Sequence, residues 1–98
     1  MNGRNNIVTV TVHVYVLVQN YKGKTTKLGV YNTPSEARFN LEITLNKFID
    51  EQYGEDLSQA CYKQETYSAI VTSKDNRHPR MILQVEERVR IIGEKKND

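Results

Sequence analysis

Apolar and polar residues alternate with a period of two from Ile7 to Val18, where valine occupies every even position from 8 to 18. Valine favours an extended backbone, and a period of two places all of these valines on one face of a strand. We therefore predict a first strand over residues 7–18 whose valine face lies in the core. The opposite, open face would carry Thr9, Thr11, His13, Tyr15 and Leu17.

A hairpin is expected directly after this strand. Residues 20–24 include the asparagine and glycine that tight turns use, and residues 25–31 resume a strand rich in Thr, Val and Tyr. The two strands should pair antiparallel. Because the second strand is shorter, the early half of the first strand needs another neighbour, which a later strand or another molecule must supply.

The clearest local signal in the chain is a helix start. Thr33 is a suitable N-cap, Pro34 suits the first helical position, and Glu36 completes a capping box with Thr33. The helix should run from Pro34 to about Tyr53. Gly54 should then end it in a left-handed conformation.

One stripe of this helix is apolar and is expected to cover the valine face of the sheet. It consists of Ala37, Leu41, Leu45 and Phe48. Phe39 and Ile43 fall roughly opposite the stripe. We expect segment 55–65 or the C-terminal tail to fold over them. The alternative is a partner-binding patch on the exposed helix face, and the exposure of Phe39 distinguishes the two.

The second half of the chain predicts two more strands. Segment 55–65 is acidic and polar with room for a short helical turn, residues 66–73 alternate as a strand, and residues 74–79 form a polar turn. Residues 81–85 predict a fourth strand, which a bulge at Glu86 and Glu87 could continue to Val89 and Ile91. Residues 1–6 and 93–98 are expected to be flexible. The sequence therefore predicts a single α+β domain, residues 1–98, with a four-stranded antiparallel sheet (β-β-α-β-β) and one helix on one face.

The search for catalytic or metal-binding chemistry finds no signature. The sequence has no phosphate-binding glycine loop, zinc-protease motif or nucleophile elbow, and one cysteine with two histidines does not support zinc. Cys61 and His78 could form a nucleophile and base, but neither has a surrounding motif. Glu86 and Glu87 are adjacent and would point to opposite sides of a strand. We predict a protein without enzymatic activity, metal or cofactor.

Composition and charge bound the compartment and the partners. A single cysteine excludes an intramolecular disulfide, which favours a reducing compartment, and we predict a cytoplasmic protein without a membrane segment. The net charge is only +2, with bases in excess in residues 1–32 and 66–98 and acids in excess in residues 33–65. The basic residues of the hairpin and of the later turn could bind nucleic acid, although lysines at loop tips also keep sheet edges soluble. They are Lys22, Lys24, Lys27, Lys74, Arg77, His78 and Arg80.

Two stretches resemble small uncharacterised phage and prophage proteins. They are Tyr15-Val16-Leu17 and the segment from Lys27 to Ala37, in which a strand and "LGVY" lead into "T-P-S-E-A" at a helix start; the family usually has phenylalanine where this chain has Tyr31. The resemblance implies a β-β-α-β fold and an origin in a mobile element, and it implies no activity. It favours an accessory protein that acts by binding, such as an inhibitor of a host or defence protein.

The sequence thus predicts a protein-binding module, with nucleic-acid binding as the alternative. One helix cannot cover both faces of a sheet, so we also predict a homodimer, formed through the open sheet face or through edge pairing of the overlong first strand. The candidate partner-binding residues are Thr11, His13, Tyr15, Phe39 and Ile43.

Overall fold

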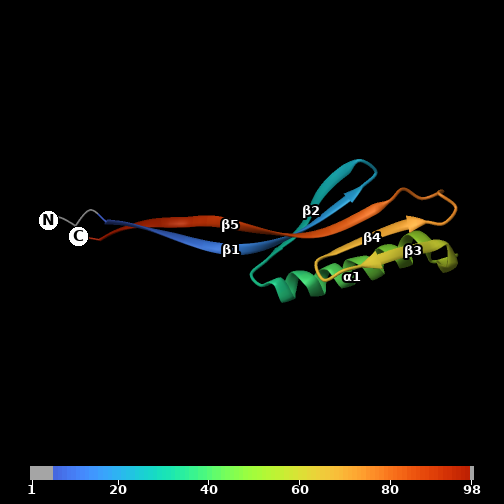
Figure 1. Cartoon of the computed structure of the whole chain (residues 1–98), viewed down its shortest axis with the longest axis horizontal. Coiled ribbons are helices and arrows are strands. Elements are labelled where there is room, and N and C mark those ends of the chain that lie inside the picture. The colour runs from blue at the N-terminus through green and yellow to red at the C-terminus, as the bar shows by residue number, and fades with distance from the viewer. Residues whose placement is uncertain (1–5, 98) are drawn as a thin grey trace.

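The computed structural model describes residues 6–97 and consists of a long antiparallel sheet with one α-helix packed on one face (Figure 1). The elements in chain order are β1 (Asn6–Tyr21), β2 (Lys24–Tyr31), α1 (Pro34–Tyr53), the short 3-10 helix η2 (Leu57–Gln59), β3 (Ala60–Gln64), β4 (Ser68–Ser73) and β5 (Met81–Asn97). The strand order in the sheet is β2-β1-β5-β4-β3, and every neighbouring pair is antiparallel. The α+β class is confirmed, but the predicted count of four strands is wrong by one.

The local signals of the sequence identify the first three elements, but β1 continues to Tyr21 instead of ending at residue 18, so the turn is shorter than the predicted residues 20–24. In the turn between β1 and β2, Lys22 and Gly23 both have positive φ, 55° and 73°. A two-residue hairpin turn needs positive φ at both positions to match the twist of the flanking strands. At the start of α1, Glu36 N donates to Thr33 Oγ1 over 3.2 Å. The helix spans Pro34–Tyr53, as the capping pattern indicated.

The helix covers the face of β1 that the sequence left open, which corrects a central prediction. The predicted helix stripe is buried, but it joins Leu17, not the valines, in the main core. The other strands add their own side chains to this core, and Tyr15 is half-buried on the same side. The buried residues of this main cluster are Leu17, Leu41, Leu45, Phe48, Tyr53, Ala69, Val71, Met81 and Leu83. Ala37 of the helix stripe is fully buried as well.

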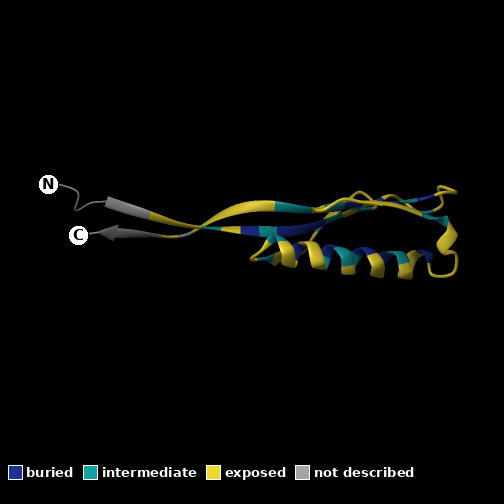
Figure 2. Cartoon of the chain, turned by 60° about the horizontal axis from the view of Figure 1, so that its bottom comes forward, coloured by how far each residue is buried: buried dark blue, intermediate teal, exposed yellow. Residues whose placement is uncertain are grey.

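The valines form a second, smaller cluster on the opposite face of the sheet. Val14, Val16 and Val18 are buried there, with Val12 half-buried beside them, although no helix within residues 6–97 covers this side (Figure 2). Val16 lies opposite Val30 on one neighbouring strand and opposite Glu86 on the other. We attribute the burial of the valines to these flanking side chains, whose stems shield a strand in the middle of a twisted sheet.

The far ends of β1 and β5 extend beyond the rest of the sheet as a two-stranded arm (Figure 1). β2 pairs with β1 only from Tyr15 to Tyr21, whereas β5 pairs with it along the whole range from Asn6 to Tyr21. The molecule is therefore elongated, with extents of 71 × 24 × 18 Å. A later strand supplies the neighbour that the early half of β1 was predicted to need.

Three further predictions for the second half of the chain are wrong. Residues 93–97 belong to β5 and pair with β1, so the expected flexible tail does not exist there; residue 98 and residues 1–5 lie outside the described residues, and Asn6 is in β1. The irregularity in this ladder falls between Val10 and Thr11, not at residues 86 and 87. Segment 55–65 contains the expected helical turn at η2 but also an unpredicted strand, β3, which pairs with β4.

The end of the helix also differs from the prediction. Gly54 has φ −55° and ψ −32°, a right-handed conformation, and the chain continues into another turn in which Asp56 N donates to Tyr53 O over 2.8 Å. No left-handed cap forms because the backbone is still turning in the helical sense.

Candidate protein-binding surface

The helix-side face of the sheet continues onto the arm without the helix above it. Because side chains alternate along a strand, the series that contains Leu17 on β1 continues outward through Tyr15, His13 and Thr11. These three residues lie opposite Glu87, Val89 and Ile91 of β5. The helix begins at Pro34, near Tyr15, so the arm beyond that point is uncovered. We call this surface of the arm, which is part apolar and part polar, the ribbon face. It consists of Thr11, His13, Tyr15, Glu87, Val89 and Ile91.

The apolar residues of this ribbon face are well exposed. Val89 has 57% of its surface accessible and Ile91 has 68%. Ile91 is the most exposed large apolar residue among the described residues. Beside them, His13 Nδ1 lies 2.7 Å from Glu87 Oε2, with both side chains more than half exposed. This contact is diagonal across the two strands, which fixes the imidazole on the ribbon face.

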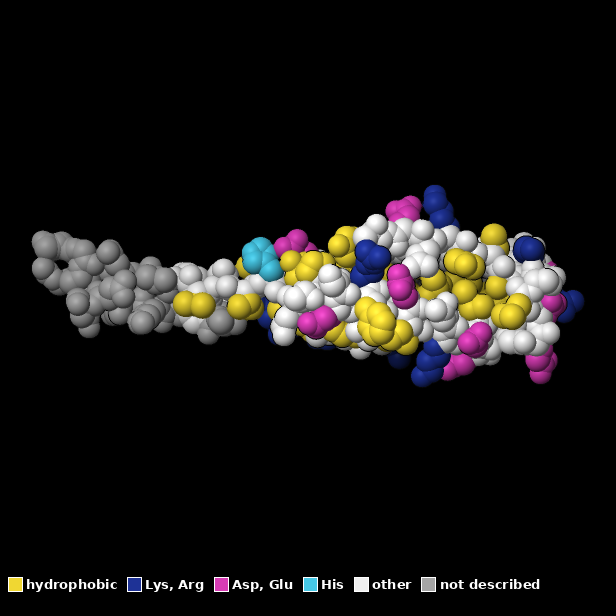
Figure 3. Space-filling view, turned by 90° about the horizontal axis from the view of Figure 1, so that it is seen from below, with side chains coloured by type: hydrophobic (Ala, Val, Ile, Leu, Met, Phe, Trp, Pro, Cys, Tyr) yellow, Lys and Arg dark blue, Asp and Glu magenta, His cyan; other side chains and the backbone are white. Residues whose placement is uncertain are grey.

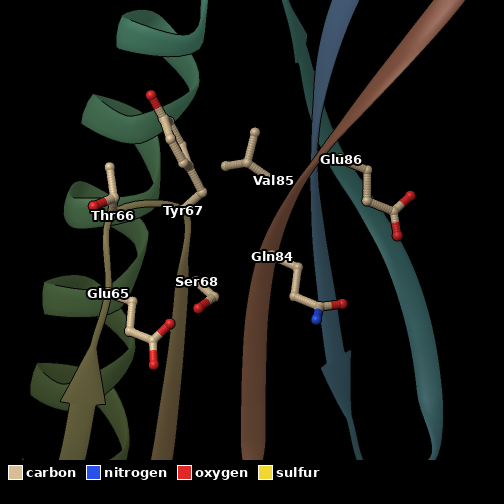
Figure 4. A pocket seen from close by; sticks show the side chains of 7 residues that line it. All are labelled: Glu65, Thr66, Tyr67, Ser68, Gln84, Val85 and Glu86. Atoms are coloured by element: carbon tan, nitrogen blue, oxygen red, sulfur yellow. The ribbon is translucent and has the colours of Figure 1, made fainter.

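Two neighbouring hollows lie where the arm joins the body, and we call the combined lining of both the arm-base surface. The first, of about 270 Å³, is lined by Tyr15, Pro34, Tyr67, Val85 and Glu87. The second, of about 490 Å³, lies next to it and shares Tyr67 and Val85. In Figure 4 the side chains of Tyr67 and Val85 lie on the helix side of the sheet, whereas those of Gln84 and Glu86 point to the other side.

The end of β4 explains why these hollows exist. β4 begins at Ser68, opposite Gln84, and the last contact of this edge is the Val85 N–H donating to Tyr67 O over 2.9 Å. From Glu86 onward β5 has no strand on its β4 side among the described residues. Tyr67 therefore lies at the end of the β4 edge, with 44% of its surface exposed. The smaller hollow therefore has aromatic walls from Tyr15 and Tyr67 and aliphatic walls from Pro34 and Val85.

The predicted partner-binding residues do not form one site. Thr11 and His13 are exposed on the arm, and Tyr15 lines the arm-base surface. Phe39 and Ile43 lie instead on the outer side of α1, with 62% and 47% of their surfaces exposed. The expectation that another segment covers them is wrong. Figure 3, a view from the helix side, shows apolar side chains gathered over the helix and others along the arm.

The basic residues predicted for nucleic acid do not form one surface. Lys24 and Lys27 lie on β2, and Lys74 directly follows β4. Lys22 and Arg80 line one hollow of about 360 Å³ at the end opposite the arm, together with Tyr21, over whose ring the Lys22 Nζ lies at 5.3 Å. Arg77 and His78 face a hollow whose other lining includes several carboxylates. These acidic residues are Asp50, Glu51, Glu55, Asp56 and Asp75.

Hydrogen bonds organise the turn that carries Arg77. The Ser73 hydroxyl and the Arg77 backbone N–H both donate to Asp75 Oδ1, and these contacts hold the pKa of the Asp75 carboxyl below its ordinary value. Arg77 Nε lies 3.5 Å from the other carboxylate oxygen. The His78 ring packs against Tyr53 at a tilt of 55° with ring centroids 4.6 Å apart, and burial raises the pKa of that tyrosine. These contacts give the turn a structural role.

The possible catalytic pair has no supporting geometry. Cys61 is exposed on β3, whereas His78 packs against Tyr53 at the end of the helix, and no hydrogen bond between Cys61 and His78 occurs in the described part of the chain. Among the described residues no group of three or more His, Cys, Asp and Glu side chains is placed to hold a metal ion. No helix of residues 6–97 is long and apolar enough to cross a membrane.

Sequence reasoning did not name several residues of the arm and its base as protein-binding residues: Pro34, Tyr67, Val85, Glu87, Val89 and Ile91. The signal that could have found the β5 side is the alternation from Val85 through Glu87 and Val89 to Ile91, which places all four on one strand face. Comparisons with protein-family models, with curated proteins and with solved structures give no match to this chain.

Proposed function

We propose that this chain is a non-enzymatic binding protein that docks onto another protein through the helix-side face of the arm and the arm-base surface. The observation that supports the proposal is the exposed pair Val89 and Ile91, placed beside hollows lined by Tyr15 and Tyr67. Full burial of an aliphatic side chain of this size contributes about 1.5–3 kcal/mol. Aromatic walls next to exposed aliphatic side chains are typical of the central part of protein interfaces.

The partner that we propose is a host or defence protein, met in the cytoplasm. This part of the proposal is supported by the resemblance of segment 27–37 to small phage and prophage proteins and by the single, exposed Cys61, which suits a reducing compartment. A phage or mobile-element accessory protein of this kind would inhibit by occupying a surface of its target.

The test is affinity capture from host-cell extract with matched variants. Val89→Thr combined with Ile91→Thr keeps β-branched residues in the strand but removes apolar surface, and we expect at least roughly tenfold less partner to be retained. The control is Ile70→Thr, since Ile70 is a comparable exposed residue on a different strand, with 39% of its surface accessible. Equal capture by wild type, arm variant and control would contradict the proposal.

The helix patch needs its own variant, because it lies apart from the arm. Phe39→Ser combined with Ile43→Ser removes the exposed apolar residues of α1 without touching the core stripe. Loss of the same partner in this variant would extend the binding surface to the helix. Retention of the partner would confine the surface to the arm and its base.

Nucleic-acid binding remains the second candidate, favoured by the single hollow that contains Lys22, Arg80 and the Tyr21 ring. Binding there would combine phosphate contacts with base stacking. Titration with single- and double-stranded oligonucleotides over a salt series tests it, and Lys22→Gln with Arg80→Gln should abolish any salt-sensitive binding. No binding at low ionic strength would exclude this candidate.

A further inference from the structure

One long edge of the sheet is free in the arm. β5 occupies one side of β1 over its whole length, and β2 occupies the other side only from Tyr15 onward. Along Asn6–Val14 the second side of β1 therefore has no strand beside it among the described residues. The backbone groups on that side form a row of donors and acceptors that can pair with another strand.

This edge differs from the other free edges in its charge. Residues 6–14 contain no lysine, arginine, aspartate or glutamate, whereas the free part of β5, residues 86–97, contains seven of them. The outer strands β2 and β3 carry Lys24, Lys27 and Lys63. Charged side chains on an edge strand prevent pairing with other chains. Of the edges in the described sheet, the β1 edge alone has no such protection.

In the part of the chain that the structure describes, the arm itself also lacks a third strand. A two-stranded ribbon is only marginally stable in water, and three or more strands with an apolar face are needed for independent stability. In this arm Val10, Val89 and Ile91 remain exposed, with 41%, 57% and 68% of their surfaces accessible. Val10 lies on one face of the arm, and Val89 and Ile91 lie on the other. A strand added along β1 would widen the sheet on both of these faces.

We infer that the free edge of β1 pairs with the same edge of a second copy of this chain, antiparallel about a twofold axis at Val10. The sequence around that residue is a palindrome, Val8-Thr9-Val10-Thr11-Val12. An antiparallel pair centred on it sets valine opposite valine and threonine opposite threonine, which is the self-complementarity that a twofold interface requires. The two arms become one four-stranded sheet in the order β5-β1-β1-β5.

Charge selects this pairing over the alternative in which β1 of one copy adds to β5 of the next. That arrangement would set an uncharged strand beside the charged edge of β5 and would desolvate charges without giving them partners. It is also head-to-tail, so it would continue into open chains instead of closing. The uncharged edge pairs with itself at no such cost and forms a closed dimer.

The expected dimer is weak. A nine-residue strand pair is about 30 Å long, and an interface made of little more than two paired arms falls below the roughly 1,200 Å² that marks stable complexes. Self-association should therefore depend on concentration. This inference uses the edge of β1, not the ribbon face proposed above for a foreign partner, so the two can be tested separately on purified chain and on extract.

Cysteine cross-linking of the purified chain tests the twofold pairing. In a Cys61→Ser background, Val10→Cys places two thiols directly opposite each other, with Cα atoms about 4.5–5.5 Å apart, within the range that a disulfide spans. The control is Ile91→Cys in the same background. In the proposed dimer the two β5 strands are outermost, about 14 Å apart, although Ile91 is more exposed than Val10. We expect at least tenfold more covalent dimer from the Val10 variant.

Charge substitutions provide the second measurement and need no oxidation. Val10→Lys and Val10→Glu each set like charges opposite each other in the pair, so each variant alone should be monomeric by sedimentation equilibrium where the wild type is dimeric. An equimolar mixture of the two should recover the dimer. Wild type that stays monomeric at millimolar concentration, or equal cross-linking of the Val10 and Ile91 variants, would overturn the inference, and the capture experiment would still decide the proposed function.

Discussion

The assignment of the helix to one face of β1 can be tested by a double-mutant cycle. In the structure Tyr21 and Phe48 pack edge to face with ring centroids 5.1 Å apart, whereas Val18 belongs to the valine cluster on the other side of the sheet. We therefore expect Tyr21→Leu and Phe48→Leu to be coupled, and Val18→Ala and Phe48→Leu to be independent.

The magnitudes follow from the contacts. An aromatic pair of this geometry contributes about 0.5–1.5 kcal/mol beyond its buried area, which is the expected coupling energy for Tyr21 with Phe48. Val18→Ala removes two buried carbons and should cost about 1.6 kcal/mol by itself. Because Val18 and Phe48 lie on opposite faces, their effects on the free energy of unfolding should add to within about 0.3–0.5 kcal/mol.

Urea unfolding followed by circular dichroism provides the measurement, at a protein concentration low enough that the chain is monomeric. All single and double variants should unfold in one transition with similar dependence on urea, which justifies the comparison of free energies. A coupling of Phe48 to Val18 that exceeds its coupling to Tyr21 would show that the helix covers the valine face, as the sequence pattern had indicated.

The remaining predictions concern the caps and turns. Thr33→Ala removes the acceptor for the Glu36 N–H and should lower the free energy of unfolding by about 0.5–2 kcal/mol, whereas Thr33→Ser should retain most of it; urea titrations compare the two. Gly23→Ala forces a side chain into φ 73° and should cost about 1–2 kcal/mol, which a lower thermal midpoint reports. The pKa of Asp75 is lowered by the Ser73 hydroxyl and the Arg77 N–H, so its ionised form favours the folded state. The stability that wild type gains over Asp75→Asn should be fully present above the ordinary carboxyl pKa of 3.8 and should decline as the pH falls through the lower, folded-state value. A gap that stays constant down to the most acidic pH at which both proteins fold would contradict the assigned contacts.

Local chemistry was sufficient to predict the elements that depend on neighbouring residues. The capping box at Thr33 and Glu36 and the proline at the first helical position define the start of α1 because they satisfy backbone groups within one turn. The glycine of the first hairpin likewise supplies a positive φ that the turn requires. The buried stripe on α1 follows from helical periodicity alone.

Two elements escaped prediction because long-range pairing determines them. β3 has no apolar alternation, with four of its five residues exposed, and it exists because β4 offers it an edge. The last residues of β5 are polar and charged, and they form a strand because β1 lies beside them. Neither sequence would favour a strand in isolation.

The choice of face on β1 depended on the tertiary structure for a related reason. Both faces of this strand are apolar enough to be core, one with its valines and the other with Tyr15, Leu17 and Tyr21. Leu17 lies opposite Val85, and in the same alternating series Met81 and Leu83 of β5 and Ala69 and Val71 of β4 face the helix. The sequence by itself determined that β1 is a strand and α1 an amphipathic helix. Only the register between distant strands decided on which side of β1 enough apolar side chains of the sheet come together to bury the apolar stripe of α1.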